Sequence, residues 1–382
     1  MRYKKRITFV TLLLFIMVFI LPFNVQAEEL KDVTAESYVL MDADSGHVLL
    51  AKNEHKQLPP ASMTKLMTLI LAAEALEEGR VDLKDEVTAS ENAWKLGGSQ
   101  IYLEPGEKMT YEDMMIAIAV GSANDACVAV AEHLDVTHEA FVENMNRKAR
   151  MLGLKDTHFI NSYGLQAEKH YSSAYDMAVM GRYALSLDKI MEYCSIKEYN
   201  LRQGEFVLYN TNKLLWWYEG ADGFKTGWTN EAKYCLTATA KRDGLRLIAV
   251  VMGCPESRGN FRDAMKILNY GFAKHSYKSF FSKGSICGTV KVGKGTKEII
   301  EVKAEEDVGS IAVKGKEDGI KITKNLLPYV NAPVKENQKL GEIRVYRDGE
   351  LCKEVNMLAV EDVPRSGWFK GILKMLAEMY LL

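Results

Sequence analysis

The chain has 382 residues, of which 47% are hydrophobic and 26% are charged. This composition is that of an ordinary globular protein, with length for two or three domains and a sizeable core. The formal net charge is −2, so the chain lacks the basic excess that a nucleic-acid partner would require.

The N-terminal segment, residues 1–27, has the pattern of a secretory signal peptide. Four basic residues precede the apolar run Ile7–Leu21, and small residues at Val25 and Ala27 suit a cleavage site after Ala27. The run of 15 residues is shorter than the roughly 20 needed to span a bilayer, which favours cleavage over an uncleaved anchor. We therefore expect an exported protein, at the outer face of the cytoplasmic membrane or in the cell wall. Cleavage would leave 45 basic and 51 acidic side chains.

The first segment of the mature chain reads as a β-hairpin. Ser37–Asp42 and His47–Ala51 are rich in apolar residues and flank Asp44-Ser45-Gly46, a turn with glycine where a positive φ is needed.

A candidate nucleophile follows at the start of a predicted buried helix. Pro60 suits its first turn, and the apolar run Leu69–Ala73 continues it. Ser62 and Lys65 lie three residues apart, so they share one face of a helix about one turn apart. Lys65 can then act as the base that activates the Ser62 hydroxyl, provided that burial or a nearby cation lowers its pKa.

Two further motifs follow in the chain. Gly121–Asp125 contains Ser122 and Asn124 and separates two apolar helical stretches. Asp222–Thr229 contains Lys225, Thr226, Gly227 and Trp228 and precedes a strand-like run. Ser-x-x-Lys, Ser-x-Asn and Lys-Thr-Gly in this order form the motif set of penicillin-binding proteins and serine β-lactamases.

The remaining elements predict an α/β (α+β) domain over residues 28–275. Its sheet would use strands from both ends of this region, with helices between and after them. The predicted helices are 114–120, 137–152, one leading to 185, and 262–272, and the predicted strands are 206–209, 234–240 and 245–252.

Residues 276–363 read as a small all-β domain, with short β-type runs separated by turns rich in Gly, Asn and Lys. Residues 364–382 form a predicted amphipathic helix. Its polar stripe of Lys370, Lys374 and Glu378 opposes an apolar face, which favours a helix lying on a membrane surface over one docked on its own protein.

The three motifs and much of the remaining chain resemble the low-molecular-mass penicillin-binding proteins, which are serine-type D-alanyl-D-alanine carboxypeptidases. The likeness extends to Asn210–Leu215, Gly220–Thr229, Leu247–Gly253 and Val330–Pro333, and to the signal peptide, the β domain and the amphipathic tail. It implies a serine β-lactamase/transpeptidase-like catalytic domain whose partners are peptidoglycan stem peptides and β-lactams.

The resemblance also implies roles for single residues. Ser62 would be the nucleophile, Lys65 the general base and Ser122 a proton relay. Asn124 would hydrogen-bond Lys65 or a substrate amide. Lys225 and Thr226 would bind the substrate's terminal carboxylate, and Gly227 would allow close approach of the strand. The oxyanion hole would combine the backbone N–H groups of Ser62 and Trp228.

Some features leave alternatives open. The second motif reads Ser-Ala-Asn, which favours the carboxypeptidase branch over class A β-lactamases, and Lys233 stands where a small residue is expected. A D,D-endopeptidase or β-lactamase of the same fold, or a non-catalytic peptidoglycan-binding protein, are the alternative functions. No cofactor or metal is expected, because the seven histidines show no ligand spacing.

Overall fold

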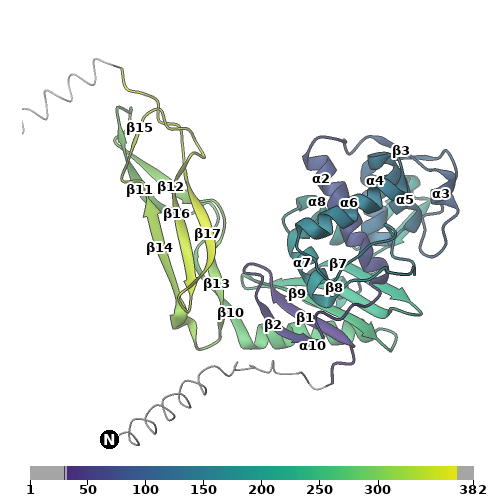
Figure 1. The fold of residues 1–382 in the computed structure, drawn as a ribbon. Helices are drawn as coiled ribbons and strands as arrows, with labels where there is room; N and C mark the ends of the chain where they lie inside the picture. Colours follow the sequence, from purple (N-terminus) through teal and green to yellow (C-terminus); the bar gives the residue numbers. More distant parts are fainter. Residues whose placement is uncertain (1–29, 31, 368–382) are drawn as a thin grey trace, which may run out of the picture. The chain divides into compact units, whose positions relative to one another are not determined.

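The computed structural model describes residue 30 and residues 32–367 (Figure 1). The predicted signal peptide lies outside the described residues, as does most of the predicted C-terminal helix. Residues 364–367 are described, and they do not begin a helix. Instead, Arg365 forms an isolated β-bridge with Gly295 and donates a hydrogen bond to the Ala332 carbonyl.

A five-stranded antiparallel sheet, ordered β2-β1-β9-β8-β7, is the framework of the first part of the chain. Its N-terminal hairpin pairs with β9, so that Ser37 is opposite Met252. The strands are β1 (Ser37–Asp42), β2 (Val48–Lys52), β7 (Ala221–Thr229), β8 (Lys233–Arg242) and β9 (Leu245–Cys254). As the apolar run predicted, β9 is central, and every residue in it except Arg246 is buried.

Helices cover both faces of this sheet (Figure 1). Gly181 of α7 (Ala174–Ala184) packs against Ile248 and Thr237, whereas Gly271 of α10 (Gly259–Lys274) packs against Leu247 and Leu40. Because consecutive strand residues point to opposite faces, Ile248 and Leu247 place the two helices on opposite sides.

The remaining helices lie between β2 and β7 in the chain. They are α2 (Lys65–Glu77), α3 (Glu91–Trp94), α4 (Tyr111–Ile116), α5 (Asn124–Asp135), α6 (His138–Met151), α8 (Asp188–Cys194) and α9 (Leu214–Trp217). Short 3₁₀ segments occur at η1 (Ala61–Thr64), η3 (Arg202–Gly204) and η4 (Glu317–Gly319), and η2 (Ala117–Gly121) is a π-helix. Two small hairpins are β3 (Glu86–Thr88) with β4 (Lys108–Thr110), and β5 (Glu198–Leu201) with β6 (Phe206–Tyr209). The sequence predicted β6 at its observed bounds but not its partner β5, nor β3 and β4.

From His275 onward the described chain is almost entirely strand. A two-stranded sheet joins β10 (His275–Phe281) and β13 (Val308–Val313), and a six-stranded sheet has the order β14-β16-β17-β12-β11-β15. The latter strands are β11 (Ile286–Gly293), β12 (Ile299–Ala304), β14 (Ile320–Leu326), β15 (Tyr329–Asn331), β16 (Lys339–Arg347) and β17 (Glu350–Ala359). The predicted class, an α/β region followed by an all-β region, is confirmed.

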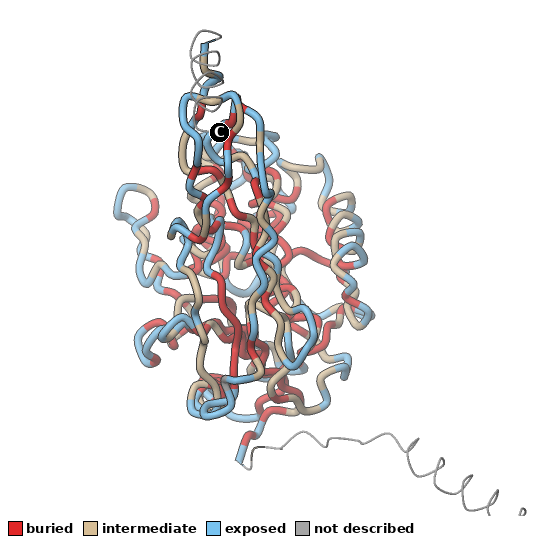
Figure 2. Tube along the Cα trace, turned by 90° about the vertical axis from the view of Figure 1, so that its left-hand side faces the viewer, coloured by how far each residue is buried: buried red, intermediate tan, exposed pale blue. Residues whose placement is uncertain are grey.

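Buried residues run through the interior of the fold, and many exposed residues lie on its peripheral segments (Figure 2). One buried cluster joins α2, α4, α5 and α7 to the sheet, and another fills the β-rich region. Helix α2 lies deep in the first cluster, because Leu66, Met67, Leu69 and Ile70 are all fully buried. A side chain at the start of α2 is therefore fixed by a rigid core.

Candidate active site

Ser62 and Lys65 are in direct contact at the start of α2. Ser62 belongs to the 3₁₀ turn η1 and Lys65 is the first residue of α2, so the predicted helix begins with a tighter turn. Pro60 precedes the turn as its N-cap. The Lys65 Nζ lies 2.9 Å from the Ser62 Oγ, which is the hydrogen-bonding distance that proton transfer between them requires.

Burial changes the acid–base properties of Lys65. Its side chain is fully buried, and loss of hydration lowers its pKa to about 7, with the positive charge of Lys225 acting in the same direction. At neutral pH a large fraction of the Lys65 amine is therefore unprotonated and able to accept the Ser62 proton.

A backbone carbonyl also holds the Lys65 amine. Lys65 Nζ donates to the Tyr163 carbonyl at 2.5 Å. The loop that carries this carbonyl is closed by Asn161, whose Oδ1 accepts from the Tyr163 and Gly164 N–H groups. Gly164 has a φ of +90°, and a Cβ there would lie 2.0 Å from the Ala61 carbonyl oxygen. Only glycine permits this approach.

Ser122 and Asn124 lie where the π-helix η2 gives way to α5. Ser122 is buried and adopts a left-handed conformation with φ 60°. The Asn124 Nδ2 donates to the Gly97 carbonyl at 2.7 Å, whereas its buried Oδ1 accepts no hydrogen bond. A buried acceptor without a partner is costly, and a ligand N–H would satisfy it.

Lys225, Thr226 and Gly227 lie on β7, at the edge of the sheet. Lys225 is fully buried and donates from Nζ to the Ala119 carbonyl in η2 at 3.1 Å. The Thr226 hydroxyl contacts that of Thr211 at 2.8 Å. A Cβ on Gly227 would lie 2.6 Å from the Pro60 carbonyl oxygen, so this glycine lets β7 run against η1, which carries Ser62.

Lys225 keeps more of its positive charge than Lys65. Burial lowers the pKa of Lys225 to about 8, so most of this amine is protonated at neutral pH. The buried thiol of Cys127 is near both lysines. Burial raises the pKa of its thiol to about 12, and Cys127 therefore remains neutral beside them.

Trp228 is placed differently from the other candidates. Its side chain is 55% exposed and its ring lies 6.1 Å from that of Tyr234. Lys233, the unexpected residue of the third motif region, points to Glu36, with Nζ 3.9 Å from a carboxylate oxygen and 47% of its side chain exposed.

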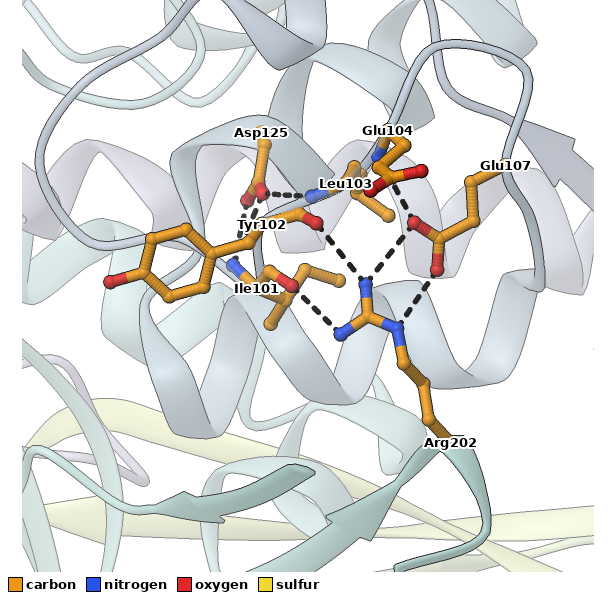
Figure 3. Close-up of polar contacts among 7 residues, drawn as sticks. All are labelled: Ile101, Tyr102, Leu103, Glu104, Glu107, Asp125 and Arg202. Atoms are coloured by element: carbon orange, nitrogen blue, oxygen red, sulfur yellow. Dashed lines mark hydrogen bonds and ion pairs between the residues drawn. The ribbon is translucent and has the colours of Figure 1, made fainter. Parts of the chain in front are cut away.

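Sequence reasoning missed the polar side chains that support the site. Asp125 follows Asn124, and its carboxylate accepts from the backbone N–H groups of Ile101 and Leu103. Arg202 binds the same loop from the other side (Figure 3). Spacing could not reveal these contacts, because about a hundred residues separate Arg202 from its partners. Within residues 32–367, no group of His, Cys, Asp and Glu side chains could hold a metal ion.

Models of known protein families match both regions of the chain. Residues 24–256 match the family model described as D-alanyl-D-alanine carboxypeptidase, and residues 275–365 match the C-terminal domain of penicillin-binding protein 5. The D-alanyl-D-alanine carboxypeptidase DacF of Bacillus subtilis (strain 168) is 42% identical over 338 residues, covering 87% of each chain.

Solved structures give the same result. Penicillin-binding protein 5 from Haemophilus influenzae has a TM-score of 0.68 at 33% identity, covering 88% of this chain and 99% of that one. Penicillin-binding protein D2 from Listeria monocytogenes, in its ampicillin-bound form, has a TM-score of 0.59 at 28% identity, covering 64% and 100%. The chain belongs to the D-alanyl-D-alanine carboxypeptidase family.

Proposed function

We propose that this chain removes the terminal D-Ala from peptidoglycan stem peptides ending in D-Ala-D-Ala, through an acyl-enzyme on Ser62. Residues 28–275 would carry the reaction. The observation that supports the proposal best is the 2.9 Å contact between the Ser62 hydroxyl and a fully buried lysine amine. A weak nucleophile and a base adapted to neutral pH are thus already paired.

Acylation begins with transfer of the Ser62 proton to the neutral Lys65 amine. The Ser62 Oγ attacks the carbonyl carbon of the penultimate D-Ala, forming a tetrahedral oxyanion. The backbone N–H groups of Ser62 and Trp228 donate hydrogen bonds to it. When the peptide bond breaks, the proton passes from Lys65 through the Ser122 hydroxyl to the departing amine of the terminal D-Ala.

The terminal carboxylate of the substrate binds on the β7 side. A protonated Lys225 supplies a charge-assisted hydrogen bond, and the Thr226 hydroxyl supplies a second donor. The buried Lys225 ammonium contacts the Ala119 carbonyl, and a carboxylate would provide the countercharge. On the other side, the unpartnered Oδ1 of Asn124 would accept an N–H of the substrate's acyl part.

Deacylation returns the enzyme to its starting state. Lys65, neutral again after acylation, accepts a proton from water, whose oxygen attacks the carbonyl carbon of the ester. Lys65 then returns this proton to the departing Ser62 Oγ, and the shortened peptide is released. β-Lactams would enter by the same attack, since acylation of Ser62 opens their ring.

The proposed location of the protein depends on its two terminal segments. We infer export directed by residues 1–27 and association of residues 364–382 with the outer surface of the cytoplasmic membrane. The part of the chain that the structure describes contains no helix long and apolar enough to cross a membrane. A peptidoglycan substrate fits a cell-wall location.

The test is release of free D-Ala from a peptide ending in D-Ala-D-Ala, together with covalent labelling by penicillin. The wild-type chain should do both, Ser62→Ala should do neither, and Ser282→Ala, at an exposed serine far along the chain, should behave as wild type. Labelling without D-Ala release would point to an endopeptidase or binding role, and rapid β-lactam turnover to a β-lactamase. Retained labelling in Ser62→Ala would disprove the nucleophile assignment.

A further inference from the structure

The loop before α5 presents an aromatic side chain on a tightly held backbone. Tyr102 has a φ of 56°, a left-handed conformation that few residues other than glycine adopt without strain. Its neighbours are anchored, since Ile101 and Leu103 are buried to within 1% exposure, whereas Tyr102 itself is 68% exposed.

Two charged side chains fix the backbone around Tyr102 (Figure 3). The Asp125 carboxylate accepts from the N–H groups of Ile101 and Leu103, each at 3.1 Å. Arg202 donates from Nη1 to the Ile101 carbonyl at 2.8 Å and from Nη2 to the Tyr102 carbonyl at 3.4 Å. Glu107 in turn holds the guanidinium through Nε at 2.9 Å. We call Asp125, Arg202 and Glu107 the clamp.

The clamp does not require a tyrosine. Every contact that it makes with residue 102 or its neighbours is to a backbone atom, and a glycine would reach φ 56° without strain. The ring of Tyr102 points away from the clamp (Figure 3). The ring contacts that of Phe206 edge-to-face at a centroid distance of 6.1 Å. Because Tyr102 is 68% exposed, folding buries little of its apolar surface, which suggests that the ring serves recognition.

The clamp is continuous with the acyl side of the proposed site. Asp125 directly follows Asn124, whose backbone N–H donates to the Ser99 carbonyl and whose Nδ2 donates to the Gly97 carbonyl. Leu165, from the loop that holds Lys65, would lie 3.8 Å from a Cβ on Gly98. Tyr102 thus belongs to the loop that borders Asn124, whereas the carboxylate-binding residues are on β7.

We propose that Tyr102 is a specificity-determining residue whose ring packs against the stem-peptide residue that precedes the two D-Ala residues. This inference rests on the proposed function. An aromatic face packs well on an aliphatic side chain, and the clamp holds it in place before the substrate arrives, so little ordering entropy is lost on binding. Arg202 would be a positioning residue for this contact.

The test compares two substrates in the full chain: a blocked D-Ala-D-Ala dipeptide and a stem pentapeptide. Tyr102→Ala should lower kcat/KM for the pentapeptide about tenfold, chiefly through KM, and leave that for the dipeptide nearly unchanged. Tyr102→Gly should show the same loss despite relief of backbone strain, and Tyr102→Phe should retain the preference. Tyr329→Ala, at a tyrosine of the β-rich region that is 51% exposed, should match wild type.

The outcomes separate this inference from the proposed function. Suppose that the wild-type chain releases D-Ala and that Tyr102→Ala lowers kcat/KM equally for both substrates, or for neither. The recognition role is then overturned and the proposed function stands. If the wild-type chain releases no D-Ala from either peptide, both fail together. Arg202→Gln should also lower kcat/KM for the pentapeptide and not for the dipeptide. An equal decrease in kcat/KM for both substrates would show that Arg202 has a purely structural role.

Discussion

Replacing Lys65 with methionine should make the protein more stable at neutral pH while abolishing activity. In the folded protein burial lowers the pKa of Lys65 from 10.5 to about 7. The unfolded chain therefore binds more protons at this position than the folded chain between these two pH values, and the folded state is disfavoured there. Because unfolding takes up a proton in this window, the stability of the wild type should rise with pH.

The magnitude follows from the two pKa values. The Lys65 penalty is about 4 kcal/mol at pH 7 and about 2 kcal/mol at pH 9, by proton linkage. Methionine removes it but leaves the Tyr163 carbonyl without its donor, at about 1–3 kcal/mol. The net gain in Lys65→Met at pH 7 should be of the order of 1–3 kcal/mol.

Urea unfolding at pH 7, 8 and 9 would measure this effect. The difference in unfolding free energy between Lys65→Met and wild type should shrink by about 2 kcal/mol from pH 7 to pH 9. Lys225 is present in both proteins, so its own titration largely cancels. Lys84→Met, at an exposed lysine, should give a curve parallel to that of the wild type. A difference independent of pH for Lys65→Met would refute the depressed pKa and with it the neutral base.

Three further outcomes are expected. The kcat/KM should rise with pH through about 7, as Lys65 loses its proton, and fall above about 8, as Lys225 loses its own. A kcat/KM that keeps rising to pH 10 would exclude a role for the charged form of Lys225. Gly227→Ala should lower kcat/KM at least ~10-fold, since its Cβ would lie 2.6 Å from the Pro60 carbonyl oxygen; unchanged kinetics would contradict that close approach. Tyr111→Phe should lose about 1–2 kcal/mol in urea unfolding, with activity retained, because the buried phenol donates to the Ala72 carbonyl; unchanged stability would contradict that bond.

Local sequence features predicted the elements that carry the motifs. Three residues on a helical turn were enough to pair Ser62 with Lys65, and the continuous apolar run of residues 245–252 predicted the central strand β9. Each of these inferences uses neighbours in the chain or a periodicity within one element.

Contacts between distant segments could not be predicted in this way. The Tyr163 carbonyl that binds Lys65 is a backbone group, so no residue type marks it. The Arg202–Glu107 pair joins segments that show no complementary spacing, and the strained φ of Tyr102 follows from tertiary hydrogen bonds rather than from local preference. The strands β3, β4 and β5, of three or four residues each, are too short to give a clear alternating pattern.

The order of strands in the central sheet has a consequence for folding during synthesis. β9 lies between β1 and β8, so the hairpin at Ser37–Lys52 has no partner until residues 245–254 have emerged. A chain cut after residue 230 would contain Ser62, Lys65, Ser122 and Lys225, yet it would lack the strands that join β7 to β1. Closure over more than 200 residues, as between Ser37 and Met252, makes such a sheet slow to form. We therefore expect Lys225, on β7, to be held beside Ser62 and Lys65 only when nearly the whole first region is present.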